Sequence, residues 1–401
     1  MKSTVLASGA LVVTAFAFGA CSGSSPTSGF DQNGGGGGGA DGGGGGGGGN
    51  DATDDIGSIG HVTDSGTTTC NPSPANYDIP GNNCDDDGDG QVDNVTVCDT
   101  GLAASGDAMA FAKSIGLCQQ ASGAKWGVVS ATYTNSHTAN TPPNDAQHGI
   151  LPKFGNVVKP REGSMFGILS SGSATENDSD TGPFFKGQKN GMQALSFGQG
   201  APPGYPKNTP GCPNLGAGVN DVIDVKLVVK APANAKGLQF DFDFYSGEWP
   251  EYVCTPYNDS FIAYLAAQGF NNGAADNMSF DVNNNPVSVN NGFFDRCTPN
   301  TKTGCAQGIG GTQKTASCPG GTAELAGTGF DDPGTYCTNP SSGGGATGWL
   351  QSKAPIKPGE TFTIEFMIWD TGDASWDSSV IVDNFLWAPG DTTAGTQRPP
   401  K

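Results

Sequence analysis

The chain has 401 residues, of which 14% are charged, and 39 acidic residues against 19 basic ones give a formal net charge of −20. This acidic balance argues against nucleic acid or anionic lipid as a binding partner and favours cations or cationic surfaces. The length is sufficient for one large folded domain, or two smaller ones, after a leader and a linker are set aside.

The first residues have the layout of a signal peptide. A short basic start at Lys2 precedes an apolar run from Val5 to Phe18, which ends in small residues before Cys21. This run is shorter than the roughly 18 to 20 residues that a membrane-spanning helix needs, so a permanent span is disfavoured. The segment 18–21, Phe-Gly-Ala-Cys, resembles a bacterial lipobox, in which the cysteine receives a diacylglyceryl group, although Phe18 stands where leucine is usual.

We therefore expect residues 1–20 to be a lipoprotein signal peptide and Cys21 to be the lipidation site that tethers the chain to the membrane. The alternative is an ordinary secretory signal that is cleaved nearby. Ser22 follows the cysteine, whereas aspartate there resembles an inner-membrane retention signal. The sequence thus favours an exported outer-membrane lipoprotein that is exposed at the cell surface.

Residues 21–69 form the expected lipid anchor and tether. Two glycine runs, 34–39 and 42–49, leave this segment almost nothing to bury, so ordering it would not repay the lost entropy. A flexible chain of this length has an r.m.s. reach on the order of 40 Å.

The cysteines indicate a disulfide framework. Eleven are present, and setting Cys21 aside leaves an even number for an oxidising compartment. A zinc or redox site is disfavoured because there is no Cys-x-x-Cys pair and there are only three histidines. We expect five bridges, mainly within residues 70–100 and among the loops between Cys254 and Cys337.

A small Cys- and Asp-rich module is expected over residues 70–100. Its sequence from position 85, Asp-Asp-Asp-Gly-Asp-Gly-Gln-Val-Asp, has acidic residues at alternate positions and a glycine at the sixth, as a wrapped calcium loop requires. It resembles the loops of thrombospondin type 3 repeats, but Thr96 stands where an EF-hand has its bidentate glutamate, which favours a structural Ca²⁺ site. The alternative is a solvated acidic loop. The expected ligands are Asp85, Asp87, Asp89, the Gln91 carbonyl and Asp93.

The rest of the chain is predicted to be mainly β. One helix is expected over residues 107–118, with Asp107 as its N-cap and an apolar face. Apolar residues alternate with polar ones over 238–245 and 361–368, and this period of two predicts half-buried strands. Residues 222–229 and 380–387 predict two more strands. The predicted fold is an antiparallel β-sandwich or jelly roll over 101–390, with one short helix, long disulfide-bonded loops and a disordered tail over 391–401.

Four segments of this region resemble the choice-of-anchor L domain family of bacterial surface proteins. They lie at 165–172, 244–253, 258–261 and 368–385, and the similarity extends over about Gly101 to Pro389. The resemblance implies surface display through an anchor and says nothing about the ligand.

Several polar residues of these segments fall at predicted strand ends, where a few can converge on a second cation or a polar ligand. The alternative is that they form Asx-turns and solvated loops. Four tryptophans, at 249, 369, 376 and 387, can either stack on sugars or pack in the core. The residues of the possible second site are Glu248, Asn258, Asp259, Asp370, Asp373, Asp377 and Asp383.

The favoured function is a binding or adhesion module, stabilised by calcium, for an extracellular glycan or protein. No serine-hydrolase elbow, zinc-protease helix or phosphate loop is present in the sequence, so no catalytic residue is assigned. Two alternatives stay open. One is a glycan-active hydrolase that uses Glu248 or Asp259 with an acid from 370–383, and the other is a structural component of the envelope.

Overall fold

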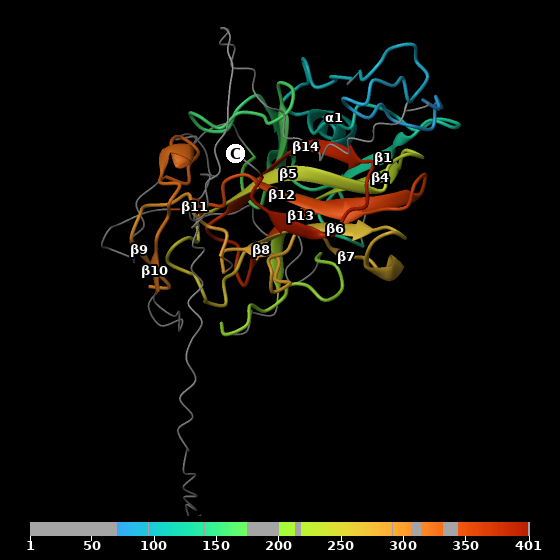
Figure 1. The fold of residues 1–401 in the computed structure, drawn as a ribbon. Coiled ribbons are helices and arrows are strands. Elements are labelled where there is room, and N and C mark those ends of the chain that lie inside the picture. The colour runs from blue at the N-terminus through green and yellow to red at the C-terminus, as the bar shows by residue number, and fades with distance from the viewer. Residues whose placement is uncertain are drawn as a thin grey trace, which may run out of the picture. The chain divides into compact units, whose positions relative to one another are not determined.

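The computed structural model describes residues 70–94, 96–138, 141–174, 200–212, 218–290, 292–305, 314–331 and 344–399. Two antiparallel sheets pack against each other, which confirms the predicted mainly β, sandwich-like fold (Figure 1). The predicted signal peptide, the Cys21 anchor and the Gly-rich tether all lie outside the described residues.

The first sheet is built around two long strands in its middle. In spatial order it contains β1 (Gly127–Thr134), β4 (Val219–Lys230), β13 (Thr361–Thr371), β6 (Ser260–Ala266) and β7 (Asp276–Asn277), with β8 (Val287–Ser288) also paired to β6.

The second sheet has β5 and β14 at its centre. Its order is β15 (Gly395–Gln397), β12 (Leu350–Pro355), β5 (Gly237–Ser246), β14 (Ser378–Ala388), β3 (Phe166–Ser170) and β2 (His148–Leu151), with β11 (Gly345–Ala346) also paired to β5. In a separate two-stranded sheet, β9 (Thr301–Thr303) pairs with β10 (Lys314–Ala316).

The core lies between the two sheets and uses the apolar face of each predicted strand. Phe240 of β5 meets Phe366 of β13 edge to face, with ring centroids 4.9 Å apart, and Phe242 lies 4.8 Å from Phe261 of β6. Burial of such aromatic side chains contributes about 1.5 to 3 kcal/mol each. The alternation in the sequence therefore identified the inner faces correctly.

The prediction that these strands are half-buried is wrong for β5, where every residue is buried. The polar face of β5 is covered by loops, and its carboxylates are satisfied there. Asp241 accepts hydrogen bonds from Arg161, Gln351 and Asn384 at 2.9 to 3.1 Å. A local period of two does not report loops that return from distant parts of the chain.

The predicted helix is shorter than expected. Helix α1 runs over Ala108–Ser114, and the carboxylate of Asp107 accepts a hydrogen bond from the backbone N–H of Ala110, as predicted for an N-cap. Its apolar face packs into the main core. Three short 3₁₀ turns are also described: η1 (Asp145–Gln147), η2 (Asn271–Gly273) and η3 (Ala323–Leu325).

Residues 70–100 lie against the sandwich, on the same side of the molecule as α1 (Figure 1). Tyr77 is buried, its hydroxyl donates to the carbonyl of Trp387, and its backbone exchanges hydrogen bonds with the Asn234 side chain. The ring also meets Trp126 edge to face. These contacts fix the Asp-rich loop relative to the second sheet.

Four disulfides are described, and Cys305 is also disulfide-bonded. Cys70–Cys84 and Cys297–Cys318 lie where bridges were expected. Two bridges reach beyond the expected regions, because Cys98 pairs with Cys118 just after α1 and Cys212 pairs with Cys254. Cys337 lies outside the described residues.

The tail from residue 391 was expected to be disordered, yet residues 391–399 are ordered and include β15. This strand pairs with β12, and Arg398 donates to the carbonyls of Thr347 and Phe293. Along the described ranges, no helix is both long and apolar enough to cross a membrane.

Candidate functional sites

The Asp-rich loop brings four carboxylates together. One oxygen from each of Asp78, Asp85, Asp87 and Asp89 lies within 4.8 Å of the other three. Carboxylate oxygens at such spacing are the ligands that hard divalent cations take. This part of the chain can therefore hold a metal ion, as the alternating acids predicted.

The loop is held by its own backbone. Asp85 accepts hydrogen bonds from the N–H groups of Gly88, Asp89 and Gly90 at 2.8 to 3.1 Å. Gly88 and Gly90 have φ of +77° and +91°, a region that glycine adopts without strain. The Cys70–Cys84 bridge closes the segment that precedes the loop.

Asp78 was missed from the sequence because it lies seven positions before Asp85, outside the repeating pattern. It is buried, and it accepts hydrogen bonds from the backbone of Asp86, Asp87 and Asn94. A carboxylate that binds three backbone groups of the loop fixes the loop's curvature. The acidic residue just after Tyr77 was the one available signal.

Of the four predicted carboxylate ligands, Asp93 lies outside the group of four. The carboxylate of Asp93 accepts hydrogen bonds from the backbone N–H groups of Asn82 and Asn83 at 3.2 and 3.0 Å. The backbone N–H of Gln91 donates to Asp89. Within the group, burial and the neighbouring carboxylates of Asp78, Asp89 and Asp85 raise the pKa of Asp87, although a backbone hydrogen bond opposes this shift. A cation would relieve that repulsion.

The second predicted set also converges in part. Glu248, Asp259, Asp370 and Asp377 are each at most 2% exposed and lie at the same end of the sandwich, where β5, β13, β6 and β14 begin or end. Asp373, in the loop between β13 and β14, faces Glu248 and Asp259. The sequence left open whether these acids are only solvated in loops. Burial rules out that alternative for the four acids that are at most 2% exposed.

Burial raises the pKa of several of these groups. It is the largest cause for Glu248 and for Asp370, and the charge of Asp259 raises both further. The pKa of Asp259 rises to about 7 through burial, against hydrogen bonds from Ser378 and Thr371.

Asp221 of β4 was not predicted, and it belongs with this group. It is 4% exposed, and burial together with the charge of Asp259 raises its pKa to about 7. Its φ of +50° interrupts the pairing of β4 with β13, where the register shifts. The pair Asn220-Asp221 just before an apolar run was the signal in the sequence.

Two residues of the second predicted set bind backbone groups of neighbouring segments instead. The side-chain oxygen of Asn258 accepts a hydrogen bond from the backbone N–H of Asn290 at 3.0 Å. Asp383 accepts hydrogen bonds from the backbone N–H groups of Arg161, Glu162 and Asn384, and burial raises its pKa. Both side chains therefore hold loops in place.

Three of the four tryptophans pack in the core instead of forming a sugar platform, whereas Trp376 is partly exposed. Trp249 is 5% exposed and stacks on Phe294 at 4.7 Å, and Trp369 and Trp387 are equally buried. The alternative of core packing is the correct one for these three.

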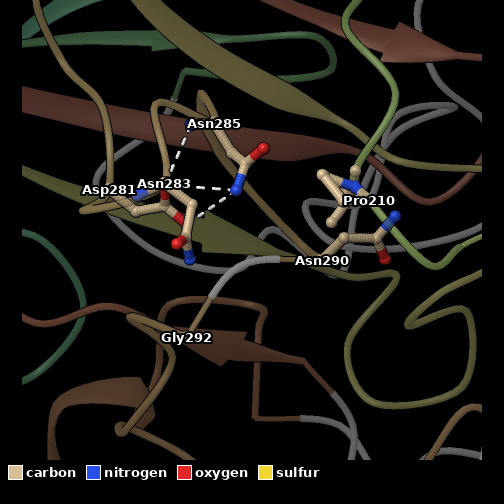
Figure 2. Close-up of a pocket in the computed structure, with 7 residues that line it drawn as sticks. Pro210, Asp281, Asn283, Asn285, Asn290 and Gly292 are labelled. Atoms are coloured by element: carbon tan, nitrogen blue, oxygen red, sulfur yellow. Dashed lines mark hydrogen bonds between the residues drawn. The ribbon is translucent and has the colours of Figure 1, made fainter.

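A polar pocket of about 410 Å³ lies elsewhere, between the loop before β8 and the loop that carries Pro210 (Figure 2). Asp281 is its one carboxylate, and the amide and backbone of Asn285 and the backbone of Asn283 donate to it. The side-chain nitrogen of Asn290 is buried without a hydrogen-bond partner. The lining residues are Thr209, Pro210, Asp281, Asn283, Asn285, Asn290 and Gly292.

Comparison with curated proteins gives no match, and comparison with solved structures gives none either. A family model does match, over a stretch that begins at the end of β4 and contains β5, β6, β13 and most of β14. The family is the Choice-of-anchor L domain, which covers residues 229–385 and confirms over that part of the chain the resemblance predicted from the sequence.

Proposed function

We propose that this chain is an exported lipoprotein, held at the cell surface by a lipid on Cys21, whose sandwich is a calcium-stabilised binding or adhesion module for an extracellular ligand. The Choice-of-anchor L match supports a surface-associated, exported module. The described disulfides support an oxidising compartment.

Calcium is the cation proposed for the Asp-rich loop. The four carboxylates offer only oxygen ligands, which are the ligands that Ca²⁺ takes at 2.3 to 2.6 Å. Without the twelfth-position glutamate the site is weak, but extracellular modules bind Ca²⁺ near about 10⁻⁴ to 10⁻³ M and remain occupied there. The role of the ion is to stabilise the loop. The hydrogen bonds of Tyr77 hold this loop against the sandwich.

Removing calcium should lower the melting temperature of the full chain made unlipidated by Cys21→Ser. Binding to the folded loop alone adds about 2.7 kcal/mol when free calcium is a hundredfold above the dissociation constant. Asp87→Asn should abolish that calcium-dependent shift, whereas Asp93→Asn should retain it, because Asp93 caps the backbone of Asn82 and Asn83. An equal loss in both variants, or a melting temperature that chelation leaves unchanged, contradicts the site.

The single observation that favours binding is the side-chain nitrogen of Asn290, a buried donor without a partner in the lining of the amide-rich pocket. Leaving such a donor unsatisfied costs about 1 to 3 kcal/mol, so a ligand oxygen would be well placed there. Hydroxyl groups of a glycan and carbonyl groups of a protein loop both supply such an oxygen.

The geometry favours binding over glycoside hydrolysis. Hydrolysis needs two carboxyl groups about 5 to 10 Å apart across the scissile bond. The pocket holds one carboxylate, which the loop already binds, whereas Glu248 and Asp259 are packed inside the sandwich.

A glycan and protein array, probed with the unlipidated chain in calcium and in chelator, tests the proposal. Asn290→Asp keeps the oxygen that accepts from the Cys254 N–H but removes the donor, and should weaken ligand binding about 10- to 100-fold. Asn283→Asp places the same charge in the same pocket and should change affinity less than about threefold. Equal losses would assign the effect to charge, and no bound ligand on either array would favour a structural component of the envelope.

A further inference from the structure

Five acidic side chains are buried together at one end of the sandwich, away from the Asp-rich loop. They come from both sheets: Asp221 and Asp370 from β4 and β13, Asp259 from the residue before β6, and Glu248 and Asp377 from the residues flanking β5 and β14. Each is at most 4% exposed. We call this group the end cluster.

The members of the end cluster contact one another. A carboxyl oxygen of Glu248 lies 3.4 Å from the backbone nitrogen of Asp259. Asp370 pairs across the sheet with Asn220, the neighbour of Asp221, and the backbone N–H of the next residue, Thr371, donates to the Asp259 carboxylate at 3.1 Å. Asp377 packs directly on Gly172, where an added Cβ would lie 1.8 Å from the Asp377 carboxyl oxygen. The acids therefore lie next to one another at this end of the sandwich.

Positive charge is missing around most of this group. In the described part of the chain, no lysine, arginine or histidine side chain forms an ion pair with Asp221, Glu248, Asp259 or Asp370. Elsewhere in the sandwich a buried acid does have such a partner, since Asp241 pairs with Arg161 at 3.1 Å and Glu365 pairs with Lys226 at 3.3 Å. Burial of several carboxylates without a positively charged partner is strongly unfavourable, because each charged group loses its hydration.

A second observation points to a missing ligand. One carboxyl oxygen of Asp221, a residue 96% buried that faces Asp259 and Asp370, has no hydrogen-bond partner. The side-chain oxygen of the adjacent Asn220 is also buried without a partner, although its nitrogen donates to the carbonyl of Asp373. Native proteins rarely leave buried acceptors in this state unless an ion or a water satisfies them.

We propose that the end cluster is a second cation site, which binds a structural Ca²⁺ between the two sheets through Asp221, Asp259 and Asp370. This inference goes beyond the loop site of the proposed function and does not depend on it. The ligand set contains only carboxylate oxygens, with the Ser171 hydroxyl beside Asp370, which suits a hard cation rather than zinc or copper. A divalent ion would neutralise the acids and join the ends of β4, β6 and β13 to the second sheet.

Calcium content measures the proposal directly. The full chain made unlipidated by Cys21→Ser should hold two Ca²⁺ per molecule after equilibrium dialysis against millimolar calcium, as read by elemental mass spectrometry. In the Asp87→Asn/Asp89→Asn background, which disables the loop, one Ca²⁺ should remain. That measurement keeps the end cluster intact, so it needs no variant at the cluster to fold.

Single substitutions at the cluster provide the second arm. Asp370→Asn and, separately, Asp221→Asn should each remove one Ca²⁺ and leave the loop ion in place. Asp243→Asn is the matched control, because Asp243 is a fully buried acid of β5 that lies outside the cluster, and it should leave both ions.

The outcomes separate the two sites. If the parent binds calcium and the Asp87→Asn/Asp89→Asn background binds none, the loop site is supported and the end-cluster site is overturned. Unchanged calcium content in Asp370→Asn and Asp221→Asn overturns it as well, and indicates that the acids share protons instead. One ion that persists in the loop background and is lost on adding Asp370→Asn supports the end cluster even if the loop binds nothing.

Discussion

Asp243 lies in the middle of β5 with its carboxyl group buried, and it contributes to the dependence of this fold's stability on pH. The Tyr245 hydroxyl and the Thr347 hydroxyl donate to its two oxygens at 2.8 and 3.1 Å. Burial, and then the charge of Glu324, raise its pKa to about 7, although these two hydrogen bonds and Arg296 act the other way.

The protonated form of Asp243 is therefore favoured in the folded chain. Between its ordinary pKa of 3.8 and about 7, the folded state binds more protons than the unfolded state, so stability falls as pH rises through that window. Each proton of difference gives a slope of about 1.4 kcal/mol per pH unit.

Asp243→Asn mimics the protonated acid and should remove that slope. We expect the free energy of unfolding of the variant, relative to the parent, to rise by on the order of 1.4 kcal/mol per pH unit between pH 4.5 and 6.5, as measured by urea denaturation. Asp391→Asn changes an acid that is 93% exposed and should show no such difference. Parallel curves for Asp243→Asn and the parent would refute the assignment.

At the scale of the element, the strands were predictable and their surroundings were not. Residues 238–245 and 361–368 alternate strictly, and this alternation fixed β5 and β13 and their core faces. Burial of the other face depends on loops such as the one that carries Arg161, which is 80 residues from Asp241 in sequence. No local pattern encodes such a contact.

The residues of the candidate sites were likewise predictable only where the sequence pattern is local. The loop acids Asp85, Asp87 and Asp89 follow from spacing within a few residues. Asp78 lies outside that spacing and joins them through hydrogen bonds from the loop backbone. The sequence offered convergence of the strand-end acids as one of two alternatives. Which acids converge depends on the pairing register of the strands. A register shift between β4 and β13 occurs at Asp221, which was missed.

The C-terminal strand β15 gives a prediction at the element scale. Arg398 donates to two backbone carbonyls at 2.6 and 2.7 Å and pairs with Asp295 at 2.9 Å, so it fastens the tail to loops of the second sheet. Arg398→Ala should lower the free energy of unfolding by about 1 to 3 kcal/mol, because hydrogen bonds to a charged group are lost.

Lys236→Ala is the control for this substitution. Lys236 pairs with Asp391 at an exposed site, where an ion pair contributes about 0 to 1 kcal/mol. Hydrogen exchange should also accelerate in residues 351–353, which pair with β15, in the Arg398 variant alone. Equal effects of both substitutions would contradict the fastening role.

For the whole molecule, the proposed function assigns anchoring to Cys21 and ligand binding to the sandwich. Two glycine runs, 34–39 and 42–49, lie along the chain between these two parts. A net charge of −20 disfavours contact with anionic lipid, so the proposed function places membrane attachment on a lipid at Cys21.

Cys21→Ser should therefore release the chain from the membrane fraction into the soluble fraction without changing its melting temperature, because the anchor lies far along the chain from the disulfide-bonded sandwich. Intact mass should show a diacylglyceryl cysteine at the N-terminus of the parent only. Ser22→Asp provides the matched control, since it keeps the lipid but alters the residue that follows it. This variant should stay in the membrane fraction and move from outer-membrane to inner-membrane density, whereas an N-terminus found elsewhere and without lipid would show that an ordinary secretory signal is cleaved instead.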